Sequence, residues 1–116
     1  MEQEQAATKQ EPDQGAKSAL SVADARAALI RMIEQDRQDD RLLRGALPYL
    51  RTVEAKPAGD GVVEIGTWTC YLKERRFNAY YISKEQNIFA DFGGNFVRDK
   101  DGHWKGVIVR ETRNLP

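Results

Sequence analysis

The stretch GTWTCYLKERRFNAYYI, residues 66–82, decides the fold, because apolar residues alternate along it on both sides of a charged turn. A hairpin with residues 73–76 as its loop gathers six apolar side chains on one face, in the pairs Leu72 with Phe77, Cys70 with Ala79 and Trp68 with Tyr81. The pattern therefore predicts an antiparallel hairpin that turns one face toward a core.

The sheet should continue to the end of the chain, since nearly all β-branched and aromatic residues lie beyond residue 61. We expect a four-stranded antiparallel meander with strands at about 62–72, 76–82, 87–98 and 103–111, joined by turns at KERR, SKEQ and DKDG. Pairing Tyr81 with Ile88 would extend the apolar face through Ala90 and Phe92.

The opposite face of this sheet is expected to mix apolar and polar residues. Its predicted members are Thr67, Thr69, Tyr71, Asn78, Tyr80, Ile82, Phe89, Asp91, Trp104, Ile108 and Arg110. The last three follow from pairing Arg98 with His103, which sets Asp91 opposite Arg110 and assigns Val107 and Val109 to the core. A bulge at Gly93-Gly94 would exchange the faces after that point.

A helix should precede the sheet and cover its apolar face. Ser21 and Asp24 have the spacing of a capping box, and an apolar stripe follows at Ala25, Leu29, Met32 and Ile33. Residues 34–41 are all polar, which leaves two alternatives: one long helix, or a second helix that starts near Asp39. Either helix should end by residues 45–48, because a proline disfavours helical backbone before it.

The first twenty residues are expected to be a disordered polar tail. Residues 1–17 contain no aromatic and no β-branched aliphatic side chain, so they cannot bury enough apolar surface to offset the entropy of ordering. The rest is one α+β domain at 21–116, divided into a helical part at 21–50, a linker at 51–61 and a β-sheet at 62–111.

Composition excludes several classes of function. Lys plus Arg and Asp plus Glu number 18 each, so the net charge of zero disfavours a general nucleic-acid binder. One cysteine and one histidine cannot form a disulfide or a Cys/His zinc site within the chain. Because no signal peptide and no long apolar segment is evident, we expect a cytoplasmic protein without membrane contact.

No motif predicts catalysis, a cofactor or a metal. Cys70 falls mid-strand on the core face, far from the turn that holds His103, which predicts a buried and unreactive thiol. The acidic run at 34–41 reads as a solvated helix face. A calcium loop aligned on Gly102 would need carboxylates where Val97 and Ile108 stand.

The sequence therefore favours a non-catalytic binding or protein-interaction module that uses the non-helix face or an edge of its sheet, with a protein partner or a second copy. The expected contact residues are Tyr80, Phe89, Asp91, Trp104 and Arg110.

Two alternatives stay open. The first is a small-ligand-binding protein or minor enzyme, with a pocket between sheet and helix that uses Asp91, Arg110 and Tyr80. The second is an RNA-contacting module in which Arg75 and Arg76, at the tip of the first hairpin, bind the nucleic acid.

Overall fold

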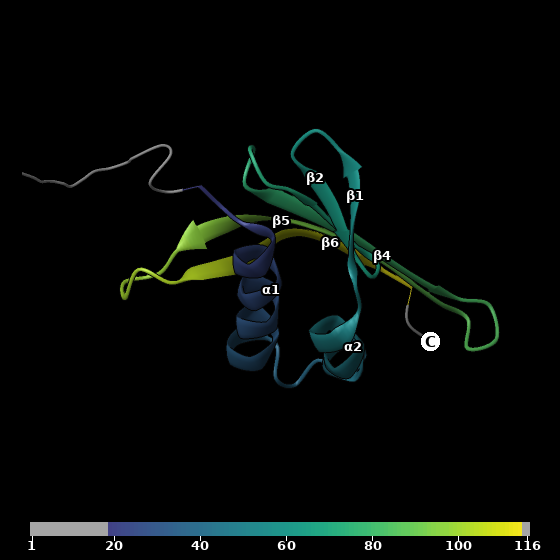
Figure 1. The fold of residues 1–116 in the computed structure, drawn as a ribbon. Helices are drawn as coiled ribbons and strands as arrows, with labels where there is room; N and C mark the ends of the chain where they lie inside the picture. Colours follow the sequence, from purple (N-terminus) through teal and green to yellow (C-terminus); the bar gives the residue numbers. More distant parts are fainter. Residues whose placement is uncertain (1–18, 115–116) are drawn as a thin grey trace, which may run out of the picture.

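The computed structural model describes residues 19–114, which form an α+β fold of two helices followed by a six-stranded antiparallel sheet (Figure 1). The elements in chain order are α1 (Val22–Asp36), α2 (Arg41–Thr52), β1 (Ala55–Gly59), β2 (Val62–Ile65), β3 (Trp68–Tyr71), β4 (Arg76–Ser83), β5 (Ile88–Arg98) and β6 (Trp104–Arg113). The strands lie in the sheet in this same order, so the predicted meander is confirmed, with six strands in place of four.

Helix α1 begins where the sequence predicts. The Ser21 hydroxyl accepts a hydrogen bond from the Asp24 amide at 3.0 Å, and the Asp24 carboxylate accepts one from the Ser21 amide at 3.1 Å. This capping box satisfies two amides that lack a partner within the helix. The buried stripe is Ala25, Ala28, Leu29, Met32 and Ile33.

A second helix follows, as one of the two alternatives proposed. Asp40 caps it by accepting a hydrogen bond from the Leu43 amide at 3.2 Å. The prediction that it ends by residues 45–48 is wrong, because α2 continues through Pro48 to Thr52. Pro48 lies on the exposed side, while burial of Leu43 and Leu50 holds the helix together on both sides of it.

The predicted linker at 51–61 is also wrong. It contains the end of α2 and the strand β1, which pairs with β2 through Lys56 opposite Glu64. Pro57 is compatible with β1 because this strand is at the edge of the sheet, where a missing amide donor costs little.

The strand expected at 62–72 is two strands, β2 and β3, separated by a tight turn at Gly66. Gly66 has a φ of 63°, in the left-handed region that favours glycine. A Cβ there would lie 3.0 Å from the ring of Tyr49 in α2, so the turn is also in close contact with the helix.

Both central hairpins are paired two residues away from the predicted register. Trp68 lies opposite Ala79, and Tyr81 lies opposite Ala90. An even shift keeps every side chain on its face, so the predicted inward face is correct. It supplies the buried residues Trp68, Cys70, Phe77, Ala79, Ala90 and Phe92.

The last hairpin differs by an odd number of residues, which reverses the predicted faces. Arg98 pairs with Trp104 rather than with His103. Trp104 is therefore buried, and Ile108 packs against the core. Val107 and Val109, predicted to be core residues, are 39% and 65% exposed.

A bulge then reverses the faces a second time. Gly94 pairs with Ile108 and Gly93 with Arg110, so Val109 is an extra residue in β6. Arg110 consequently returns to the face predicted for it, although its Cα partner is Gly93 and not Asp91.

Both helices lie on one side of the sheet, with the core between them and the strands (Figure 1). Residues 1–18 of the predicted tail lie outside the described residues. Leu20, assigned to that tail, is buried at 5% exposure, so the packed part of the chain starts before Ser21. No helix among residues 19–114 is long and apolar enough to cross a membrane.

Candidate functional site

The sheet face turned away from α1 and α2, here called the open face, has no described helix over it (Figure 1). Tyr80 and Ile82 on β4 are 52% and 60% exposed there. Large apolar side chains of this exposure on neighbouring positions are typical of contact surfaces. We define the open-face patch as Asn78, Tyr80, Ile82, Phe89, Asp91 and Arg110.

Strand pairing brings the members of the patch together. Tyr80 lies opposite Asp91, and Ile82 lies opposite Phe89. The rings of Tyr80 and Phe89 meet edge to face with centroids 5.3 Å apart, an arrangement that restricts the exposed tyrosine. The patch therefore has an apolar half beside a charged half.

A shallow hollow of about 230 Å³ lies within the patch and extends to the start of β3. It is lined by Thr67, Thr69, Asn78, Ala79, Tyr80, Asp91 and Arg110. Hydroxyl, amide, carboxylate and guanidinium groups thus share one small depression. This combination suits polar contacts with a side chain of a partner.

Gly93 leaves room for Arg110 in the hollow. A Cβ at Gly93 would clash with Nη2 of Arg110 and would lie 3.0 Å from its Cζ, so a larger residue would displace the guanidinium from this position. In this position Nη1 of Arg110 is 3.4 Å from Oδ1 of Asp91. Both side chains remain accessible, at 53% and 35% exposure.

The structure thus places Tyr80, Phe89, Asp91 and Arg110 on one face, but Trp104 is separate from them. Trp104 is buried on the helix side, where its carbonyl accepts a hydrogen bond from the Arg31 guanidinium and the guanidinium of Arg98 stacks 4.5 Å from its ring centre. Its role is packing, and its assignment to the mixed face is corrected.

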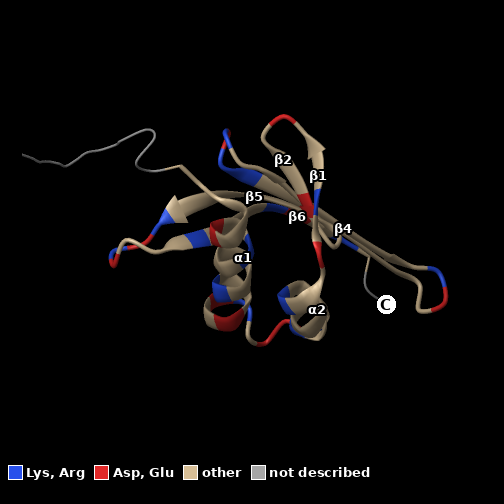
Figure 2. Ribbon diagram, in the orientation of Figure 1, with Lys and Arg blue, Asp and Glu red and all other residues tan. Residues whose placement is uncertain are grey.

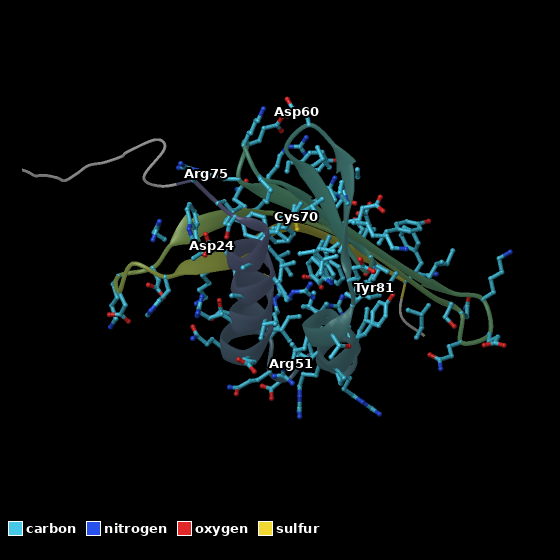
Figure 3. All side chains as sticks on the ribbon, viewed as in Figure 1. Asp24, Arg51, Asp60, Cys70, Arg75 and Tyr81 are labelled. Carbon is cyan, nitrogen blue, oxygen red and sulfur yellow. The ribbon has the colours of Figure 1, made fainter. Side chains whose placement is uncertain are left out.

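The hairpin arginines proposed for RNA both stack on rings of the protein itself. The Arg75 guanidinium lies 5.4 Å from the ring centre of Trp104, and the Arg76 guanidinium lies 3.8 Å from that of Tyr71. Arg76 also pairs with Glu74 at 2.6 Å. Figure 3 labels Arg75 at this turn. These contacts explain both cations as packing groups of the hairpin.

A second hollow, of about 750 Å³, lies between α2 and the β4–β5 hairpin. Its lining is Arg41, Leu42, Gly45, Ala46, Tyr81, Gln86 and Ile88. Tyr81 extends from the sheet toward α2 in Figure 3. Among the described residues, Asp91, Arg110 and Tyr80 line the hollow on the open face and not this one, so the structure does not bring them to a pocket between sheet and helix.

An ion network that the sequence did not reveal ties the connection between the helices to β6. Asp40 pairs with Arg113, and Glu111 pairs with Arg113 at 2.5 Å and with Arg37 at 3.0 Å. Burial opposes ionisation of Asp40, but hydrogen bonds from Arg113 and the Leu43 amide outweigh it and lower its pKa. Part of the acidic run at 34–41 therefore connects the helices to β6 through ion pairs and is not only a solvated surface.

Cys70 is fully buried within the sheet (Figure 3), and burial raises the pKa of its thiol to about 12. A thiol in that state is a poor nucleophile. His103 lies on the β5–β6 turn beside Asp99 and Asp101, the one acidic and imidazole cluster found among the described residues. The Asp99 carboxylate accepts the amides of Asp101 and His103 at 2.9 Å each, which accounts for it as a turn-forming residue.

Comparison with known proteins gave no match: no family model, no curated protein and no solved structure is detectably similar to the chain.

Proposed function

We propose that the protein is a non-catalytic interaction module that binds a protein partner on the open-face patch. The observation that supports this is the exposure of Tyr80 and Ile82 on a sheet face that α1 and α2 leave uncovered. Covering these side chains would remove apolar surface from water, which is favourable by a free energy of about 25 cal/mol for each Å² of apolar area buried. The fully buried thiol of Cys70 is compatible with a reducing cytoplasm, where we place this binding.

Tyr80 has the properties of an anchor residue. Tyrosine contributes a large ring at a low entropic cost, and here the ring of Phe89 already restrains it. The neighbouring Asp91 and Arg110 supply polar groups that would set the orientation of a partner. An apolar anchor beside polar groups is the usual anatomy of a specific interface.

Site-specific photo-cross-linking in cells tests this function, because the chain offers a matched control. Tyr80 on the open face and Tyr49 on α2 are both exposed tyrosines, at 52% and 60%. A benzophenone amino acid is placed at each position in turn, and the adducts are identified by mass spectrometry. We expect a defined adduct from position 80 and none from position 49. Equal adducts from both positions, or none from position 80, would contradict the proposal.

The hollow between α2 and the β4–β5 hairpin supports a second candidate function, the binding of a small ligand. Its wall combines the apolar side chains of Leu42, Ala46 and Ile88 with polar groups, and Arg41 makes no ion pair with any described residue. An aromatic or short-chain carboxylate would suit these groups. Ala46→Trp should fill the hollow and abolish any thermal shift that such a carboxylate causes in the unaltered protein. Arg44→Gln, one turn from Arg41 but outside the lining, is the control.

A further inference from the structure

We infer that the partner of the open-face patch is a second copy of this chain, related by a two-fold axis. The inference rests on the proposed function, because it assigns an occupant to the same patch. It is carried by the side-by-side placement of Asp91 and Arg110 beside the exposed ring of Tyr80.

The charges of the patch are complementary to themselves. In a two-fold interface, if residue i of one copy contacts residue j of the other, then residue j of the first copy contacts residue i of the second. Two opposite charges on the two sides of the axis therefore form two ion pairs. Asp91 and Arg110 are adjacent and of opposite sign, and both remain accessible. An axis between them would set Asp91 of each copy near Arg110 of the other. A partner of a single sign would leave one of these groups unpaired.

The ion pair between Asp91 and Arg110 within one copy leaves both groups able to pair with a second copy. Arg110 has five N–H donors, and its ion pair within residues 19–114 is the one to Asp91 at 3.4 Å. No hydrogen bond accompanies this pair among the described residues. The guanidinium also lies against Gly93, and the Arg110 side chain is 53% exposed, so it keeps donors that a facing copy could reach.

The rest of the surface does not oppose self-association. The chain has a net charge of zero, so two copies approach without long-range repulsion. Figure 2 shows positive and negative residues interspersed, many of them at hairpin tips and on the helices. The apolar half of the patch, Tyr80, Ile82 and Phe89, would pack beside the paired charges.

Complementary charge reversal tests the inference. Asp91→Arg leaves two positive groups on each patch, and Arg110→Asp leaves two negative groups. We expect the unaltered protein to form a reversible dimer in sedimentation equilibrium, and each variant alone to dimerise about tenfold more weakly or worse. An equal mixture of the two variants should recover the dimer as a heterodimer, because each reversed patch then faces its complement. An internal pair cannot produce this recovery.

The exposed pair of Asp60 and Lys73, 2.8 Å apart at the tips of two hairpins, supplies the control. Figure 3 shows Asp60 at the tip of the β1–β2 hairpin, and neither Asp60 nor Lys73 belongs to the patch. Asp60→Arg should leave dimerisation unchanged. Thermal unfolding of all variants checks that each is folded.

The outcomes separate this inference from the proposed function. A dimer that both reversals leave intact, or a mixture that stays monomeric, would overturn the second-copy inference. A protein that is monomeric at all concentrations would overturn it as well, while a heterologous adduct at position 80 would leave the interaction function standing. Loss of both the dimer and that adduct would overturn both.

Discussion

The two faces of the sheet differ in solvent exposure, even where their side chains come from the same strand. On β4, Phe77 and Ala79 are 0% and 1% exposed beneath the helices, whereas Tyr80 and Ile82 are 52% and 60% exposed on the open face. Alternation along one strand therefore puts large rings into a closed core on one side and onto an uncovered surface on the other. The core explains the stability of the fold, and the exposed side chains on the other face are the ones that we propose as contact residues.

The largest contrast is expected from truncating one aromatic residue on each face. Phe77→Ala removes a fully buried ring and should lower the free energy of unfolding by about 3–5 kcal/mol. Tyr80→Ala, three positions along the same strand, should change it by about 0.5 kcal/mol or less in the monomer. Urea unfolding at low protein concentration measures both, and losses of similar size would mean that the open face is part of the fold's core.

A glycine pair gives the next contrast, between the interior of the sheet and the open hollow beside α2. A Cβ at Gly94 would clash with the Val107 carbonyl and lie 2.5 Å from Phe77, so Gly94→Ala should cost about 1–3 kcal/mol. Gly45 has no atom within 4 Å of a Cβ, and Gly45→Ala should add about 0.5–1 kcal/mol through helix propensity. Thermal unfolding compares them, and stabilisation by Gly94→Ala would contradict the described bulge.

These contrasts also show what the sequence could and could not predict. Period-two alternation fixed the inward face of residues 66–92, because an even register shift does not alter it. It failed in the last hairpin, where a pairing of Arg98 with Trp104 instead of His103 moved the pattern by one residue. The bulge at Gly93-Gly94 then reversed the faces again. The glycine pair marked this position as a possible bulge, but the alternation of residues could not show whether the bulge forms.

The missed elements have physical reasons as well. The strand β1 contains proline and glycine, which are typical of linkers, and it is held in place by pairing with β2. Helix α2 passes Pro48 because tertiary burial of Leu43 and Leu50 outweighs local propensity. For the candidate site, alternation correctly predicted that Tyr80, Phe89 and Asp91 share one face. Arg110 lies on that face only because of the bulge, and Trp104 lies in the core instead.

A smaller effect is expected at the ion network on the covered side. Asp40→Ala removes the cap of α2 and the partner of Arg113, and should cost about 1–2 kcal/mol at neutral pH. The pKa of Asp40 is lower in the folded than in the unfolded state. The contribution of the Asp40 carboxylate to the free energy of unfolding is therefore present above the unfolded-state pKa and is lost as the pH falls through the folded-state pKa. The difference in the free energy of unfolding between the unaltered protein and Asp40→Ala, measured with urea, should therefore shrink in acid. A difference that grows in acid would contradict the assignment of Asp40 as a cap and ion-pair partner.

The smallest effect is expected at Cys70. With a fully buried thiol whose pKa is raised to about 12, the native protein should not react with a thiol reagent near pH 8 except through unfolding. The reaction rate should follow the unfolding rate as urea is added. Rapid reaction in the absence of urea would show that the covered face is accessible.

The most direct test of the open face as the contact surface is a dilution series followed by NMR. Amide shifts are compared between concentrated and dilute protein, residue by residue. We expect concentration-dependent shifts at the open-face patch, centred on Tyr80, Asp91 and Arg110, with little change in α1 and α2. Shifts confined to the helices, or none at the patch, would contradict its assignment as the surface that meets a second copy.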